Sequence, residues 1–193
     1  MNKEKIAILV DSCCNVPQEF VDKYGMYVIP LKVLYKDREY MDGVDITAEE
    51  VYRGLEKEIP KTSLPSGEHI QKILDRIKAD GYEKVIAVTI SSGLSGTNNM
   101  INLLAKNYEG LEFFVLDTKN ISIGSGFHAI QAARYLEAGM SYQAICEKLE
   151  KEVMNCKVFF VVETLEYLQK GGRIGLVASL FGNALHLKPI ISC

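Results

Sequence analysis

The chain has few of the features that mark nucleic-acid-binding, membrane or secreted proteins. It carries 22 lysines and arginines against 25 aspartates and glutamates, a formal net charge of −3 without a basic run, so no nucleic-acid partner is expected. No apolar segment approaches the length of a membrane span. Residues 1–5 lead directly into a short strand pattern, which is unlike a signal peptide.

The five cysteines include no C-x-x-C pair and show none of the spacings of a zinc site. Cys13 and Cys14 are adjacent, which rarely makes a disulfide, and the other three are interpreted as buried or incidental thiols: Cys146, Cys156 and Cys193. This usage predicts a reducing, cytoplasmic location. Neither a metal nor a cofactor is expected.

Against this background, residues 89–97 (Thr-Ile-Ser-Ser-Gly-Leu-Ser-Gly-Thr) are rich in glycines and hydroxyls. They follow the apolar run 85–88, which is typical of a buried strand, and precede residues 98–105, whose apolar positions recur at helical spacing. Glycine allows close approach of the backbone to a ligand, and a helix N-terminus favours an anion. Residues 91–97, here called the serine loop, are therefore an anion-binding loop or an ordinary turn with a serine or threonine N-cap.

The surrounding residues narrow the kind of anion. A nucleotide phosphate loop needs a lysine at the helix start, but there is no lysine or arginine between Lys84 and Lys106. Hydroxyls and amides without a cation suit a single negative charge better than a triphosphate. The sequence thus predicts a loop for a small monovalent anion.

A serine-dependent hydrolase or transferase, acting on a small acyl or phosphorylated substrate, is the alternative. Residues 93–97 nearly match the nucleophile-elbow pattern G-x-S-x-G, with Ser95 as the nucleophile, but Thr97 stands where the last glycine belongs. Such an enzyme also needs a histidine base, and the three histidines are scattered without a triad pattern.

Unbroken apolar strands alternate with helical patterns, which predicts an α/β fold with a mainly parallel sheet and flanking helices. Because ligands bind at the carboxyl ends of such strands, Asp11, the serine loop and Asp117 are expected to converge, with both aspartates capping strand ends. Residues 60–67 are predicted to be a loop. The predicted strands are 6–10, 26–35, 85–88, 113–116 and 158–162.

The last residues begin another strand pattern at 188–191. This predicts that residues 1–155 form an N-terminal α/β domain and that residues 156–193 are the start of a truncated C-terminal domain. A naturally short protein is the alternative.

Six stretches, in order along the chain, resemble the DegV family of bacterial fatty-acid-binding proteins. Each is modest alone, but their joint order is specific. They are residues 10–12 (Val-Asp-Ser), 28–31 (Val-Ile-Pro-Leu), 61–66 (Lys-Thr-Ser-Leu-Pro-Ser), 90–97, 115–118 (Val-Leu-Asp-Thr) and 165–175 (Leu-Glu-Tyr-Leu-Gln-Lys-Gly-Gly-Arg-Ile-Gly). Leu64 stands where the family usually has glutamine.

The resemblance implies a long-chain fatty acid buried between two α/β domains and no chemistry of the protein's own. It implies that Thr62 and Ser95 hold the fatty-acid carboxylate, with Ser91 and Ser92 as nearby candidates. It also implies that a separate fatty-acid kinase is a partner, to which the bound fatty acid is presented for phospholipid synthesis.

Other ligand contacts remain open from the residues. Arg173 in the Gly-Gly-Arg turn is a candidate for pairing with the carboxylate, for a structural salt bridge or for contact with a partner's phosphates. An apolar slot is needed for the acyl chain, and each of its candidates has core packing as the alternative role. These candidates are Ile121, Ile123, Gly124, Phe159, Phe160, Leu180, Phe181 and Leu185.

Overall fold

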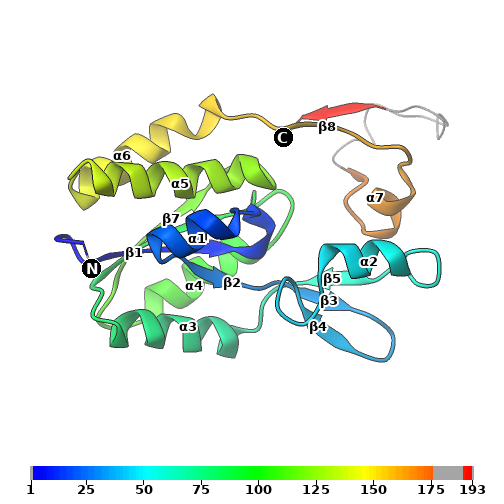
Figure 1. Ribbon diagram of the computed structural model, residues 1–193, viewed down its shortest axis with the longest axis horizontal. Helices are drawn as coiled ribbons and strands as arrows, with labels where there is room; N and C mark the ends of the chain where they lie inside the picture. Colours follow the sequence, from blue (N-terminus) through cyan, green and yellow to red (C-terminus); the bar gives the residue numbers. More distant parts are fainter. Residues whose placement is uncertain (1, 176–188, 193) are drawn as a thin grey trace.

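A four-stranded sheet, entirely parallel, lies at the centre of the larger part of the molecule (Figure 1). The computed structural model describes residues 2–175 and 189–192. The strand order is β2-β1-β6-β7, formed by β2 (Tyr27–Ile29), β1 (Ile6–Asp11), β6 (Lys84–Thr89) and β7 (Glu112–Asp117). The predicted α/β class with a mainly parallel sheet is confirmed.

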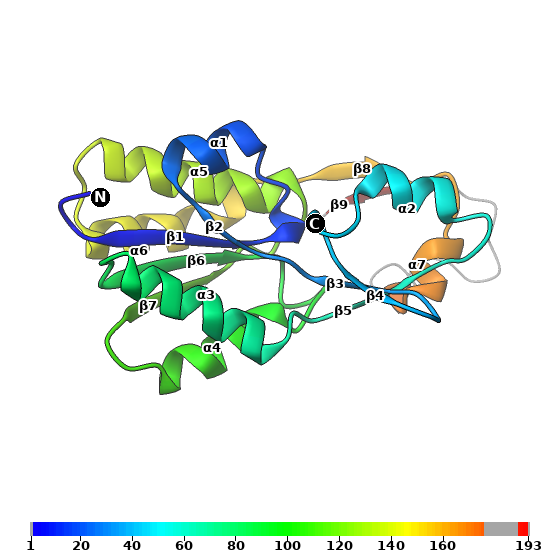
Figure 2. The same cartoon turned by 60° about the horizontal axis from the view of Figure 1, so that its bottom comes forward.

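Helices cover both faces of this sheet (Figure 2). One face packs against α1 (Gln18–Tyr24), α5 (Ile123–Glu137) and α6 (Tyr142–Glu152). The other packs against α3 (Gly67–Ala79) and α4 (Thr97–Asn107). Side chains of β1 alternate between the two cores, which explains why its sequence is apolar at every position rather than at every second one.

The chain changes face between the two central strands. After β1 it continues into α1 on one face, whereas after β6 it continues into α4 on the opposite face. In open parallel sheets this arrangement leaves a crevice at the carboxyl ends of the two strands, where ligands bind. The serine loop follows β6 directly and therefore lies at this crevice.

A second, smaller sheet is antiparallel and lies to one side of the first (Figure 1). It consists of β4 (Glu39–Met41), β3 (Lys32–Leu34) and β5 (Lys61–Ser63), in that order across the sheet. The helix α2 (Ala48–Gly54) lies in the connection between β4 and β5. β3 and β4 pair as an antiparallel hairpin. The Thr47 and Glu50 capping box at the start of α2 is present as the sequence indicates.

Two predictions about this region are wrong. The single strand over 26–35 is two strands in two different sheets, because Pro30 has no amide hydrogen to continue a ladder. The predicted loop over 60–67 contains β5, in which Thr62 pairs with Val33 of β3. All three residues of β5 are exposed, so no apolar alternation marks this strand in the sequence.

The predicted strand over 158–162 is present as β8 (Phe159–Val161), but it is not part of the parallel sheet. It pairs antiparallel with β9 (Ile190–Ser192), and the short helix α7 (Glu166–Lys170) lies between them in sequence. The domain boundary at residue 155 remains a prediction. Within the described residues, no helix is long and apolar enough to cross a membrane.

Candidate ligand-binding site

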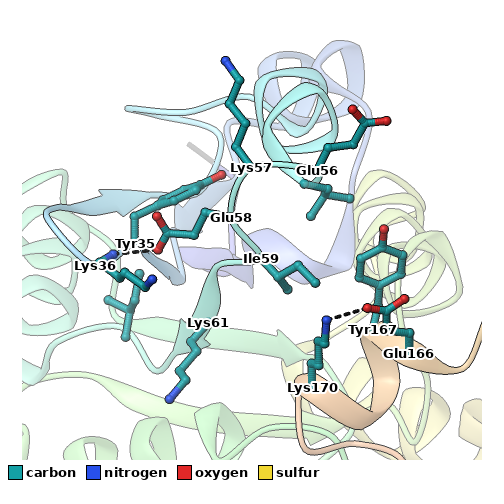
Figure 3. Close-up of a pocket in the computed structure, with 12 residues that line it drawn as sticks. Tyr35, Lys36, Glu56, Lys57, Glu58, Ile59, Lys61, Glu166, Tyr167 and Lys170 are labelled. Carbon is teal, nitrogen blue, oxygen red and sulfur yellow. Dashed lines mark hydrogen bonds and ion pairs between the residues drawn. The ribbon is translucent and has the colours of Figure 1, made fainter.

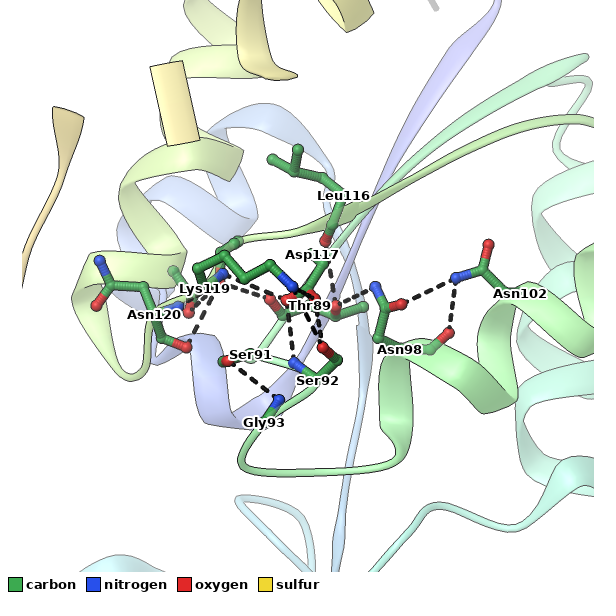
Figure 4. Close-up of polar contacts among 12 residues, drawn as sticks. Thr89, Ser91, Ser92, Gly93, Asn98, Asn102, Leu116, Asp117, Lys119 and Asn120 are labelled. Carbon is green, nitrogen blue, oxygen red and sulfur yellow. Dashed lines mark hydrogen bonds and ion pairs between the residues drawn. The ribbon is translucent and has the colours of Figure 1, made fainter. Parts of the chain in front are cut away.

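The carboxyl ends of three strands meet at the serine loop, as the strand pattern predicts (Figure 4). Asp11, at the end of β1, accepts a hydrogen bond from the Ile90 amide at 2.8 Å. Asp117, at the end of β7, accepts from the amide of Ser92 at 3.0 Å and from its hydroxyl at 2.5 Å. Both aspartates therefore hold the loop in place. Burial raises the pKa of Asp11 to about 6, although the Ile90 amide opposes this.

The two adjacent serines of the loop have different freedom to bind a ligand. Ser92 donates its proton to Asp117, so its hydroxyl is engaged by the protein itself. The Ser91 hydroxyl accepts from the Gly93 amide at 3.2 Å and retains its own proton for another acceptor. The Ser91 amide donates to the carbonyl of Asn120 at 2.8 Å, which ties the loop to the connection after β7.

Ser95 lies directly before the first turn of α4. Its hydroxyl oxygen accepts from the Thr97 amide at 3.3 Å and is 2.8 Å from the Thr97 hydroxyl. When the buried Thr97 hydroxyl donates to Ser95, the Ser95 proton remains free for a ligand. The helix N-cap is Gly96, which offers no side-chain cap, so the ordinary serine- or threonine-capped turn is not what forms here.

The first turn of α4 adds backbone donors. Within the part of the chain that the structure describes, the amides of Asn98 and Asn99 have no hydrogen-bond acceptor. The Asn98 side chain donates to the Thr89 hydroxyl at 2.9 Å, which fixes the start of the helix against the end of β6 (Figure 4). Such a helix start stabilises a negative charge placed beside it.

Two segments distant in sequence pack against the serine loop. The Leu64 side chain, two residues after Thr62, lies 3.4 Å from the position that a Cβ on Gly96 would occupy. The Arg173 guanidinium donates through Nε to the Leu94 carbonyl at 3.3 Å. The segments of residues 61–66 and 165–175 therefore flank the same loop.

Arg173 is directed to the loop by the turn that follows α7. Gly172 has a φ of 77°, a left-handed conformation that favours glycine, and the Arg173 amide then donates back to the Leu168 carbonyl at 2.9 Å. Among the described residues, Arg173 forms no ion pair with an acidic side chain. The structural salt bridge that the sequence left open is therefore not formed here.

The expectation of a loop without a nearby cation is wrong. Lys119 reaches the loop from the connection after β7: its ammonium lies 2.5 Å from a carboxylate oxygen of Asp117 and 3.5 Å from the Ser92 hydroxyl. Arg173 is a second cation beside the loop. The sequence analysis names Arg173 as a candidate, but counting charges only between residues 84 and 106 missed Lys119, although a lysine two residues after a strand-end aspartate was a usable signal.

The described candidates for the acyl slot come from two segments that contact each other, because the Asn120 side chain donates to the Cys156 carbonyl at 2.9 Å. That they line an acyl slot remains a prediction. A Cβ on Gly124 would lie 2.4 Å from both the Asn120 and the Val158 side chains, which matches close packing rather than an open slot. Ile121 and Ile123 are partly buried, while the Phe159 residue is 66% exposed on the β8 strand. Phe160 is partly buried, and the remaining candidates lie outside the described residues: Leu180, Phe181 and Leu185.

A groove of about 720 Å³ lies next to Thr62, between the connection after α2 and the helix α7 (Figure 3). Its lining combines apolar side chains with seven charged ones. In Figure 3 Ile59 and Tyr167 lie on opposite sides of it, and Lys170 pairs with Glu166 at 2.5 Å. The charges make this groove unsuited to an acyl chain. The charged residues are Lys36, Glu56, Lys57, Glu58, Lys61, Glu166 and Lys170.

Among the described residues, no histidine contacts Ser95 as the serine-nucleophile alternative requires. No contact joins Ser95 to a histidine: His69 lies in α3, and the buried His128 makes its ring contact with the Gly124 carbonyl at 3.0 Å. His186 lies outside the described residues. In residues 2–175 and 189–192, no three histidine, cysteine or acidic side chains gather as metal ligands.

Comparison with known proteins shows the family of this chain. Residues 5–193 match the model of the family described as uncharacterised proteins of the DegV family. A DegV domain-containing protein of Clostridium acetobutylicum is 42% identical over 189 residues, which are 98% of this chain and 68% of that protein. The chain belongs to the DegV family and spans about two thirds of the length of such relatives.

Solved structures share the fold. A DegV family protein from Thermus thermophilus, described by its fatty-acid binding, superposes with a TM-score of 0.86 at 32% identity, over 100% of this chain and 68% of that one. A stearic-acid-binding protein from Eubacterium ventriosum gives a TM-score of 0.85 at 31% identity, over 97% and 66% of the two chains. Relatives with this fold thus bind long-chain fatty acids.

Proposed function

We propose that this protein binds a long-chain fatty acid, with the carboxylate at the serine loop. The observation that carries the proposal is the meeting of three segments from distant parts of the chain. Leu64 contacts Gly96 and Arg173 contacts Leu94, so Thr62 and Arg173 belong to the two segments that flank the loop.

The donors available at the loop suit a carboxylate. Ser95, Ser91 and the free amides at the start of α4 donate hydrogen bonds, and Arg173 supplies a charge nearby. Charge-assisted hydrogen bonds of this kind offset the cost of taking a carboxylate out of water. Burial of about 14 methylenes at about 0.8 kcal/mol each contributes on the order of 10 kcal/mol towards binding.

In this proposal the protein is a carrier without chemistry of its own. It holds the fatty acid and presents the carboxylate to a separate fatty-acid kinase for phospholipid synthesis. Support comes from the family resemblance and from Ser95, which contacts a threonine and no described histidine.

Solvent extraction tests the binding function directly. The purified 193-residue chain is denatured, extracted with organic solvent and analysed by mass spectrometry. A near-stoichiometric amount of C14–C18 fatty acid is expected. An empty extract, followed by no binding of added oleate or palmitate in titration, would show that this chain is not a fatty-acid carrier.

A further inference from the structure

A negative charge lies against the serine loop before any ligand binds, because Asp117 at the end of β7 contacts Ser92. Asp117 accepts hydrogen bonds from Ser92 on both carboxylate oxygens. Asp117 therefore lies in the middle of the hydrogen-bonding network around the loop (Figure 4). Two carboxylates in one site repel each other, and a nearby ion of opposite sign relieves the repulsion. A fatty-acid carboxylate at this loop therefore requires that the charge of Asp117 be compensated.

Lys119 makes two contacts that provide this compensation. Its amide donates to one oxygen of Asp117 at 3.3 Å, and its ammonium donates to the other oxygen at 2.5 Å. The ammonium also reaches the Ser92 hydroxyl at 3.5 Å. One lysine therefore contacts Asp117 from both its backbone and its side chain.

The backbone at Lys119 is folded to make this possible. Its φ of 52° is left-handed, a conformation that is unfavourable for a residue with a Cβ. Ser122 in the same connection is left-handed as well, with a φ of 55° and a ψ of −145°. Asn120, between them, is fully buried and accepts from the Ser91 amide. Such conformations persist where the surroundings hold them, often at functional sites.

We propose that Lys119 is a positioning residue of the ligand site, which neutralises Asp117 so that the serine loop accepts the carboxylate of the fatty acid. This inference rests on the proposed function. Lys119 lies two positions beyond β7, and its ammonium contacts Asp117 and Ser92, so its positive charge offsets the negative charge of Asp117 beside the loop. The Lys119 side chain is 57% exposed, so solvent screens part of its charge, whereas the side chain of Asp117 is only 19% exposed.

Binding of two matched ligands to three variants tests the role of Lys119. The delipidated chain is titrated with oleate and with oleyl alcohol, which has the same chain and no charge. Lys119→Met removes the charge and keeps most of the stem, and Lys119→Gly removes the charge while relieving the left-handed backbone. Both are expected to weaken oleate binding about fivefold at low salt and to leave oleyl alcohol unchanged.

Lys119→Arg keeps the charge and is expected to bind oleate within about twofold of the wild type. Unchanged oleate affinity in Lys119→Met and Lys119→Gly would overturn the proposal. An equal loss for oleate and oleyl alcohol would also overturn it, because it would show a general effect on the fold. If the wild type binds oleyl alcohol and oleate equally weakly or not at all, the proposed function itself fails, and the role of Lys119 with it.

Discussion

At the scale of single residues, Asp11 and Asp117 both hold the segment that follows β6, but their pKa values are shifted in opposite directions. Both accept hydrogen bonds from the segment that follows β6. Asp11 is 1% exposed, and its burial raises its pKa to about 6. Burial also acts to raise the pKa of Asp117, but hydrogen bonds from Lys119 and Ser92 outweigh it and lower the pKa overall.

The raised pKa of Asp11 predicts a specific pH dependence of stability. The folded state binds the Asp11 proton more tightly than the unfolded state, so its contribution is fully present below about pH 4 and is lost as the pH rises to about 6. Asp11→Asn removes this titration. The free energy of unfolding of Asp11→Asn, relative to the wild type, should rise by about 2–3 kcal/mol between pH 4 and pH 7 in urea titrations.

Asp117→Asn is the matched control with the opposite sign. Because the folded state favours the ionised Asp117, its stabilisation is present at neutral pH and is lost as the pH falls below about 4. For Asp11, a constant difference in the free energy of unfolding between Asp11→Asn and the wild type across pH 4–7 would contradict the prediction. It would mean that Asp11 titrates as an ordinary exposed aspartate.

At the scale of elements, the packing of α5 against the short turn after β1 depends on Gly126. A Cβ at this position would lie 2.5 Å from the Cys14 carbonyl oxygen, which is backbone and has little room to move. Gly126→Ala should therefore lower the free energy of unfolding by about 1–3 kcal/mol, measured by urea denaturation at neutral pH.

Gly67→Ala provides the comparison for this substitution. Like Gly126, Gly67 lies in a helix, where it is the first residue of α3. A Cβ at Gly67 would have no atom within 4 Å. The variant should be as stable as the wild type or up to about 1 kcal/mol more stable, because alanine favours helix. Equal stability of the two variants would show that α5 shifts to accept the methyl group at no cost.

At the scale of the whole molecule, the proposed ligand site combines segments that lie far apart in the chain. Thr62 comes from the small antiparallel sheet, Ser95 from the crevice of the parallel sheet and Arg173 from the turn after α7. The parallel sheet provides the rigid base, and the two other segments approach from outside it (Figure 2).

This arrangement predicts how ligand binding responds when both sides of the site are changed. Combining Thr62→Ala with Ser95→Ala should weaken oleate binding at least tenfold, since each hydrogen bond to a charged group contributes about 1.5–3 kcal/mol. Isothermal titration of the delipidated protein measures the effect. Ser63→Ala, whose side chain points to the opposite face of β5 from that of Thr62, should bind oleate as the wild type does.

The double variant should stay folded but lose about 1–3 kcal/mol in the free energy of unfolding, because Ser95→Ala leaves the buried Thr97 hydroxyl without its partner. Ser63→Ala should unfold at nearly the same urea concentration as the wild type, because Ser63 is exposed. Unchanged oleate affinity in the double variant would place the carboxylate elsewhere on the protein.

Local rules were sufficient for much of the fold. Continuous apolar strands predicted the parallel sheet, and the capping-box pattern of Thr47 and Glu50 is present at the start of α2. These features depend on neighbours within a few residues, and such neighbours can be seen in the sequence. The convergence of Asp11 and Asp117 on the serine loop also followed, because parallel strands end at one edge.

Only the tertiary structure decided which residues share the site and which stay apart. The polar, exposed strand β5 has no apolar pattern, and the break at Pro30 sends β2 and β3 into different sheets. Lys119 contacts Ser92 across 27 positions of the chain and Arg173 contacts Leu94 across 79, so no local charge count includes them. The sequence alone specified a loop able to bind an anion, whereas long-range packing supplied its cations, because contacts between distant segments depend on how the whole chain folds.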